Sequence, residues 1–141
     1  MLIRIKIVDG GKAPEYQHEG DACCDCYSRL VAPFITIPNK ARVLINLGFC
    51  IELPKGYEAV IRPRSGMTKS GIDVAIGTID ESFRGEVKCQ IINNSGGDYD
   101  IKNLERICQM KIQRAERFEF LEVEKLSETD RGDKGFGSTG K

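Results

Sequence analysis

Apolar and polar residues alternate with a period of two along most of this chain, and this alternation restricts the fold more than any other feature. Successive side chains of a β-strand point to opposite faces, so the pattern is typical of strands with one buried face. Turn signals separate the alternating stretches, for example P-N at 38–39, P-K-G at 54–56 and N-S-G-G-D at 94–98. The spacing predicts an all-β sandwich or barrel, with one short helix at Ser65–Gly71. The predicted strands are residues 2–8, Ala22–Tyr27, Arg42–Leu47, Tyr57–Arg62, Asp73–Thr78, Gly85–Asn93, Ile107–Gln113 and Phe118–Val123.

Length and charge set further bounds. The chain has 141 residues, which fits one domain with a core of its own. Its 21 basic and 21 acidic residues cancel, so we expect no general attraction to nucleic acid or to membranes. No stretch resembles a signal peptide or a membrane span, which predicts a cytoplasmic protein with reduced cysteines. Cys50, Cys89 and Cys108 have apolar neighbours and are interpreted as core residues.

The last fifteen residues differ from the rest, so we divide the chain into a β-barrel domain at 1–126 and a flexible tail at 127–141. The tail holds four glycines, six charged residues and one aromatic residue, Phe136. Such a segment cannot bury enough apolar surface to order itself, and a frayed terminus is the ordinary interpretation. The order Arg131, Phe136 and then G-S-T-G also suits a tail that closes over a phosphate-bearing ligand with a flat ring.

Three short motifs carry groups that could act on such a ligand. In P-R-S-G at 63–66, Arg64 offers a phosphate-binding fork, although Arg-Ser-Gly is also common in solvated loops. Asp80 follows a predicted strand, where it is either a turn residue or a general base that orients a water. Gln109 either points its amide at a ligand or faces solvent.

The stretch G-D-A-C-C-D-C-Y-S at 20–28 holds three of the six cysteines. One hypothesis is a non-enzymatic zinc module, but C-C-x-C places adjacent side chains on opposite faces of a strand. In that module the zinc ligands would be His18, Cys23, Cys24 and Cys26. The other hypothesis gives the functional role to the carboxylate of Asp25 and none to the cysteines.

Taken together and in order, five motifs resemble those of the homotrimeric dUTPases over about residues 12–140: D-A-C-C-D-C, P-R-S-G, G-T-I-D-E-S-F-R-G-E, E-R-I-C-Q and R-G-D-K-G-F-G-S-T-G. The resemblance implies a jelly-roll-like β-barrel and a homotrimer whose active sites are shared between subunits. It implies Mg²⁺-dependent hydrolysis of dUTP to dUMP and pyrophosphate, which limits uracil in DNA and supplies dUMP for dTMP synthesis. The tail of one subunit would close the site of a neighbour.

Residue roles follow from the same resemblance. Asp80 would activate the attacking water, and Asp25 would reach the magnesium ion through a water. Phe136 would stack on the uracil, Phe83 would lie against the deoxyribose, and the hairpin around Ala75–Phe83 would select uracil. The implied substrate contacts are Arg64, Ser65, Gly66, Gly77, Thr78, Ile79, Phe83, Gln109, Arg131, Phe136, Gly137, Ser138 and Thr139.

The chain departs from the family pattern in ways that bear on function. The family usually has Tyr where this chain has Phe83, so the ring is kept and the hydroxyl is lost. The fourth motif usually begins Gly-Asp, and here it begins Leu104-Glu105. A dCTP deaminase of the same fold is the alternative enzyme, but I-D-E-S-F-R-G in the third motif matches the hydrolase form.

Overall fold

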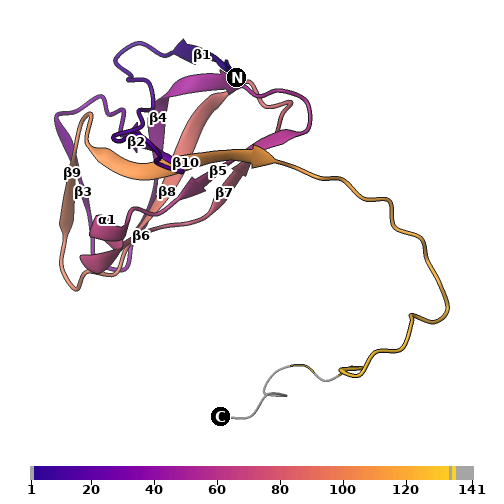
Figure 1. Ribbon diagram of the computed structural model, residues 1–141. Helices are drawn as coiled ribbons and strands as arrows, with labels where there is room; N and C mark the ends of the chain where they lie inside the picture. Colours follow the sequence, from indigo (N-terminus) through magenta and orange to yellow (C-terminus); the bar gives the residue numbers. More distant parts are fainter. Residues whose placement is uncertain (1, 134, 136–141) are drawn as a thin grey trace.

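The regular structure of the chain is almost entirely β-strand, as seen in a computed structural model that describes residues 2–133 and 135 (Figure 1). One short helix interrupts the strands, and no helix among these residues is long and apolar enough to cross a membrane. The elements are β1 (Arg4–Ile7), β2 (Cys24–Tyr27), β3 (Phe34–Ile37), β4 (Arg42–Glu52), β5 (Tyr57–Arg62), α1 (Ser65–Lys69), β6 (Ile72–Val74), β7 (Gly77–Ile79), β8 (Glu86–Asn93), β9 (Tyr99–Lys102) and β10 (Arg106–Arg114).

The strands form two four-stranded sheets and one two-stranded ribbon. The first sheet has the order β1-β4-β8-β6, the second β2-β10-β5-β7, and β3 pairs with β9. All pairs are antiparallel, and from β4 to β8 each successive strand lies in the other sheet. This crossing between two packed sheets confirms the predicted all-β, jelly-roll-like fold.

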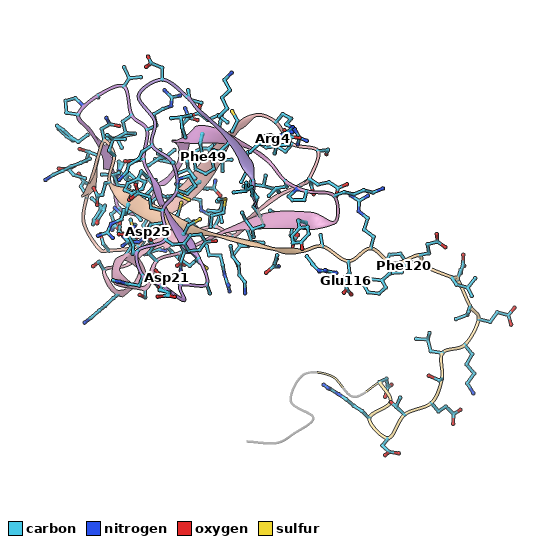
Figure 2. The ribbon with its side chains drawn as sticks, turned by 45° about the horizontal axis from the view of Figure 1, so that its top comes forward. Arg4, Asp21, Asp25, Phe49, Glu116 and Phe120 are labelled. Atoms are coloured by element: carbon cyan, nitrogen blue, oxygen red, sulfur yellow. The ribbon has the colours of Figure 1, made fainter. Side chains whose placement is uncertain are left out.

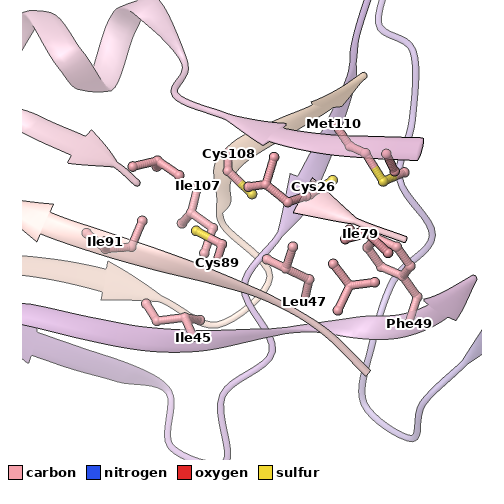
Figure 3. Packing of buried hydrophobic residues seen from close by; sticks show 14 of the residues in the cluster. Cys26, Ile45, Leu47, Phe49, Ile79, Cys89, Ile91, Ile107, Cys108 and Met110 are labelled. Carbon is pink, nitrogen blue, oxygen red and sulfur yellow. The ribbon is translucent and has the colours of Figure 1, made fainter. Parts of the chain in front are cut away.

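The core lies between the inner faces of the two sheets (Figure 3). Ile45, Leu47 and Phe49 of β4 face it from one sheet, and Met110 of β10 faces it from the other. Cys89 and Cys108 are fully buried there, as predicted. The prediction for Cys50 is wrong, because Phe49 and Ile51 point inward and the alternation turns Cys50 outward to a partly buried position outside the core.

Several predicted strands differ from the observed ones. The predicted strand Asp73–Thr78 is divided into β6 and β7, which belong to different sheets. The short strands β3 and β9 were not predicted. Half of the residues of each are exposed, so the alternation of apolar and polar residues that marks a strand with one buried face is weak in them.

The predicted strand Phe118–Val123 is absent from the described residues. After β10 the chain leaves the barrel and runs away from it in an extended form (Figure 1). Phe118 is 74% exposed and Phe120 is 100% exposed, so the alternation is present without a partner strand among the described residues of this chain. A strand needs such a partner for its backbone hydrogen bonds.

A bulge in β4 fixes the start of β8. The register of β4 against β8 shifts between Asn46 and Cys50, and Gly48 between them has a φ of 76°. A Cβ at Gly48 would lie 2.5 Å from the Gly11 Cα, so no larger residue fits. The N–H of Gly48 donates to Glu86 Oε1 at 3.0 Å, and Arg29 donates Nε and Nη2 to the two oxygens of the same carboxylate at 2.7 and 2.9 Å. Glu86, at the start of β8, therefore connects this strand to the bulge of β4 and to the segment that contains Arg29.

We predict that Glu86→Gln lowers the free energy of unfolding at pH 7 by about 1–3 kcal/mol, because it removes hydrogen bonds to a charged group that is 18% exposed. The hydrogen bond from Arg29 lowers the pKa of Glu86 below its ordinary 4.5. A lowered pKa contributes stability that is present above pH 4.5 and is lost as the pH falls below it. Urea unfolding should therefore show a difference between the two proteins that narrows at acidic pH.

The exposed Glu116 provides the matched control, and Glu116→Gln should change stability by no more than about 0.5 kcal/mol at either pH. A Glu86→Gln difference of equal size at pH 7 and at pH 3 would show that the ion pair with Arg29 is not its source.

Candidate functional site

The site begins with three residues on adjacent strands of the second sheet. In the register of β10, Gln109 lies opposite Asp25 of β2 on one side and opposite Arg62 of β5 on the other. Cys24 and Cys26 point into the core, with 4% and 0% exposure, so the alternation turns Asp25 to the outer side. Gln109 lies between Cys108 and Met110, which are both buried, and it is turned outward for the same reason.

The carboxylate of Asp25 is held by two guanidinium groups. Arg64 donates Nε to Oδ1 at 2.9 Å, and Arg106 donates Nη1 to Oδ2 at 3.2 Å. Arg64 also donates Nη1 to the backbone carbonyl of Arg106 at 2.8 Å, which closes a ring of contacts. The Asp25 side chain is only 12% exposed. One carboxylate thus stands between two cations, and the three groups together carry one excess positive charge.

This cluster lies in a cleft of about 430 Å³, which we call the first cleft. Figure 2 shows Asp21 and Asp25 on the same side of the barrel. The structure brings together the predicted residues Arg64, Ser65, Gly66 and Gln109, and Gln109 donates Nε2 to the Pro63 carbonyl at 2.7 Å. The full lining is Gln17, His18, Asp21, Ala22, Cys23, Asp25, Arg64, Ser65, Gly66, Arg106 and Gln109.

Sequence reasoning missed Arg106 and Gln17. With strict alternation, Arg106 and Gln109 would point to opposite faces of β10. A register shift between Arg106 and Cys108 makes Ile107 and Cys108 both face the core, and it brings Arg106 to the same side as Gln109. The signal available in the sequence was the pair of adjacent apolar residues Ile107-Cys108 in E-R-I-C-Q.

Asp80 lies in a second cleft, of about 620 Å³, at the end of β7. Its side chain is exposed, and its carbonyl accepts the N–H of Phe83 at 3.1 Å in a turn. The Phe83 ring packs on Gly85, where a Cβ would lie 2.7 Å from the ring, so Gly85 is required for this packing. The lining residues are Asn46, Thr78, Ile79, Asp80, Phe83, Gly85, Glu86, Val87 and Lys88.

The segment Ala75–Phe83, expected as a hairpin, lies between two paired strands. β6 and β8 on either side of it pair antiparallel in the first sheet, whereas β7 within it pairs with β5 of the second sheet, so the turn at Asp80 crosses between the sheets. Gly77 pairs with Ile61 in the second sheet and lines neither cleft.

The other predicted residues lie elsewhere along the chain. Arg131 lies in a turn between Thr129 and Gly132, in the segment that follows β10, and lines neither cleft. Phe136, Gly137, Ser138 and Thr139 fall outside the described residues. The first and second clefts share no lining residue.

The cysteines near Asp25 are in contacts that do not suit a metal. Cys23 lines the first cleft, whereas Cys24 points into the core, where it also borders an apolar groove, and donates Sγ to the Met110 carbonyl at 3.4 Å. A hydrogen bond with Cys26 and burial raise the pKa of the Cys24 thiol, which keeps it protonated. Within residues 2–133 and 135, no group of three or more His, Cys, Asp or Glu side chains could hold a metal ion. The zinc hypothesis gains no support from these contacts.

The barrel has a cleft lined by two arginines beside a short helix. It has a second cleft that contains an exposed aspartate. These features define a class of β-barrel proteins suited to binding polyphosphate ligands. The family model described as dUTPase matches residues 9–140. The chain belongs to the dUTPase family.

Individual relatives agree with this assignment. A deoxyuridine 5'-triphosphate nucleotidohydrolase of Finegoldia magna is 43% identical, with 98% of this chain and 99% of the relative covered. One of Rickettsia bellii is 45% identical, with coverages of 98% and 95%. Among solved structures, the dUTPase of Staphylococcus bacteriophage 80alpha with dUPNHPP is similar with a TM-score of 0.90 and 25% identity, over 99% of this chain and 98% of that one.

We predict that Asp25→Asn lowers the free energy of unfolding by about 1.5–3 kcal/mol, because it leaves Arg64 and Arg106 without their shared counter-charge. In a double-mutant cycle with Arg64→Gln, the two changes should be non-additive by more than about 0.5 kcal/mol. The measurement is urea unfolding of the four proteins at one protein concentration.

Asp100→Asn is the control, because Asp100 accepts a hydrogen bond from Thr36 at an exposed site. It should cost no more than about 0.5 kcal/mol. Additive effects of Asp25→Asn and Arg64→Gln would mean that the ion pair between them contributes nothing to stability.

Proposed function

We propose that this chain hydrolyses dUTP to dUMP and pyrophosphate, and thereby limits uracil in DNA and supplies dUMP for dTMP synthesis. The proposal rests on the first cleft, in which Ser65, Gly66 and Gln109 lie beside the ion pair of Arg64 with Asp25. The relatives from Finegoldia magna and Rickettsia bellii, which match nearly from end to end, bear the name of this activity.

The first cleft binds the triphosphate in this proposal. Asp25 fixes Arg64 through Nε, and the Arg64 Nη2 group makes no hydrogen bond within the described residues. Nη2 is therefore available for a phosphate oxygen, to which a guanidinium donates strong charge-assisted hydrogen bonds. Ser65 and Gly66, where α1 begins, lie beside it and complete the contact with the phosphates.

Asp80 is the general base of the reaction. Its carboxylate takes a proton from the water whose oxygen forms a bond to the α-phosphorus. The bond from the α-phosphorus to the oxygen that bridges to the β-phosphate breaks, and pyrophosphate leaves. Positioning and charge neutralisation contribute most of the rate in phosphoryl transfer, so the placement of water and phosphates matters more than covalent chemistry by the protein.

Magnesium is the proposed cofactor, and the residues of the first cleft fit contact with the ion through a bound water, not direct ligation. Both oxygens of Asp25 already accept a guanidinium, so direct ligation would compete with these ion pairs. A carboxylate has about four lone-pair sites, which leaves Asp25 able to accept a hydrogen bond from a metal-bound water. Magnesium prefers oxygen ligands and keeps several waters, so the substrate phosphates would supply the direct ligands. The ion would neutralise charge on the phosphates.

The second cleft takes the nucleoside. Phe83 is held against Gly85 and is 43% exposed, so its ring offers a flat face to the deoxyribose. Thr78 and Ile79 line this cleft, and β7, which begins at Gly77, is the edge strand of its sheet, so its unpaired backbone would bind the uracil edge and leave no room for a thymine methyl group. The tyrosine hydroxyl usual in the family is absent here, so sugar discrimination rests on the shape of the ring.

A homotrimer with shared active sites is part of the proposal. The first and second clefts have no residue in common, so a site that needs both sets of residues can draw them from two subunits. The segment after β10 carries exposed apolar residues that find no partner in the barrel, which suits contact with another copy. In Figure 2, Glu116 and Phe120 mark its path away from the barrel. The tail at 127–141, with Arg131, Phe136, Gly137, Ser138 and Thr139, would close the neighbour's site, with Phe136 on the uracil.

We also propose a cytoplasmic location. All six cysteines are free in the structure, and Cys26, Cys89 and Cys108 lie buried together without a disulfide. Free thiols in this number suit a reducing compartment.

We predict that Asp80→Asn lowers kcat for dUTP hydrolysis by about 10²–10⁴-fold, because the amide cannot accept a proton from water. The dissociation constant for the analogue dUPNHPP should change by no more than a few-fold. Phosphate release from dUTP, coupled to a pyrophosphatase, measures the rate, and calorimetry measures the binding. The exposed Asp9 lines neither cleft, so Asp9→Asn serves as the control and should keep the full rate.

A kcat within threefold of the wild type in Asp80→Asn would exclude Asp80 as the base. The same assay with dCTP, dTTP and UTP tests the substrate. Ammonia release from dCTP would replace the proposed hydrolase with a deaminase of the same fold.

We predict that a chain ending at Thr129 loses at least about tenfold in kcat/KM for dUTP, because one base-stacking contact alone contributes about 1–3 kcal/mol. Sedimentation should still give the mass of a trimer, since the segment 115–126 is kept. An unchanged kcat/KM would refute the closing role of the tail, and a monomeric mass would show that residues 130–141 hold the subunits together instead.

A further inference from the structure

Arg106, the first residue of β10, is a second arginine in the first cleft, beside the Arg64 that is proposed to bind the triphosphate. Its side chain is 45% exposed and lines the cleft together with Arg64 and Gln109. It reaches this position because of the register shift between Arg106 and Cys108. The charge therefore lies at the cleft because of a specific backbone irregularity, and not because of a flexible surface side chain.

One end of the Arg106 guanidinium is fixed. Nη1 donates to Asp25 Oδ2 at 3.2 Å and to Gln17 Oε1 at 3.1 Å. Gln17 is held in turn, because its N–H donates to Asp21 Oδ2 at 3.1 Å and its Nε2 donates to the Glu15 carbonyl at 3.4 Å. Two side chains from different segments thus orient the plane of the guanidinium.

The other end of the group is available. Nε and Nη2 of Arg106 donate to no group within residues 2–133 and 135. Guanidinium groups carry five N–H donors in a planar fork that matches two phosphate oxygens. Asp25 balances only one of the two positive charges beside it. Asp21 also lines the cleft, and the backbone N–H groups of Gln17 and His18 donate to its Oδ2, which fixes this second carboxylate beside the arginines without cancelling its charge.

We propose that Arg106 binds the β- and γ-phosphate part of the substrate through Nε and Nη2, and that Gln17 is a positioning residue that holds Arg106 for this contact. The inference rests on the proposed function, which supplies a triphosphate ligand for the first cleft. It adds a second guanidinium to the contact made by Arg64. The two arginines, fixed by one shared carboxylate, would hold the leaving pyrophosphate from two sides.

The first test uses inorganic pyrophosphate as the probe, with Mg²⁺, and measures its dissociation constant by calorimetry. Arg106→Gln should raise this constant by about 10–100-fold, because a charge-assisted contact is lost. It should raise the constant for dUPNHPP by a similar factor and that for dUMP by less than threefold. Arg106→Lys keeps the charge but loses the fork, so it should fall between the wild type and Arg106→Gln.

Arg114→Gln is the matched control. Arg114 is the last residue of the same strand, is exposed and lies over Tyr57, away from the cleft. The substitution changes the net charge of the chain equally and should leave all three constants unchanged. Pyrophosphate binding that is equal in Arg106→Gln and Arg114→Gln overturns the proposal, and so does a loss of dUMP binding as large as that of pyrophosphate.

The second test addresses Gln17. Gln17→Ala should raise KM for dUTP by about threefold to tenfold and leave kcat within twofold, and it should have no further effect in the Arg106→Gln background. Additive effects of the two changes would remove Gln17 from the proposal. A wild-type chain that hydrolyses no dUTP would refute the proposed function, while the pyrophosphate measurement would still decide the role of Arg106.

Discussion

The ion pairs of the Asp25 carboxylate with Arg64 and Arg106 are the interaction on which the first cleft depends. The two hydrogen bonds of this carboxylate join β2, the segment before α1 and the start of β10, which are far apart in sequence. Without that carboxylate, two guanidinium groups would lie side by side and repel each other. With it, both groups are oriented, and in the proposed function their remaining N–H donors bind phosphate. In the proposed function, stability and ligand binding therefore rest on the same three side chains.

Much of this could be predicted from the sequence. The alternation gave Tyr57–Arg62 with the observed bounds and placed Asp25 and Gln109 on strands. The ordered motifs resembled the dUTPases, and the family comparison confirms that assignment. These predictions succeeded because side-chain periodicity and turn residues act locally, within a few residues of the sequence.

Other features depend on contacts between distant segments, and for that reason local patterns did not reveal them. The bulge that turns Arg106 toward the cleft exists because Ile107 and Cys108 both find room in the core. The crossing at Asp80 depends on β7 pairing with β5, while β8 pairs with β4. The predicted strand at Phe118–Val123 has the right alternation but no partner strand within its own barrel. Partner strands and room in the core are properties of the folded molecule.

The central claim is that the cluster around Asp25 forms a phosphate site ready for the substrate. A crystal structure of the chain with dUPNHPP and Mg²⁺ tests it most directly. The account predicts the β- and γ-phosphates in the first cleft, within hydrogen-bond distance of Arg64, Ser65 and Arg106, with the contacts of Asp25 to both arginines kept. A triphosphate bound outside this cleft, or an Asp25 that has left both arginines to ligate the metal directly, would contradict it.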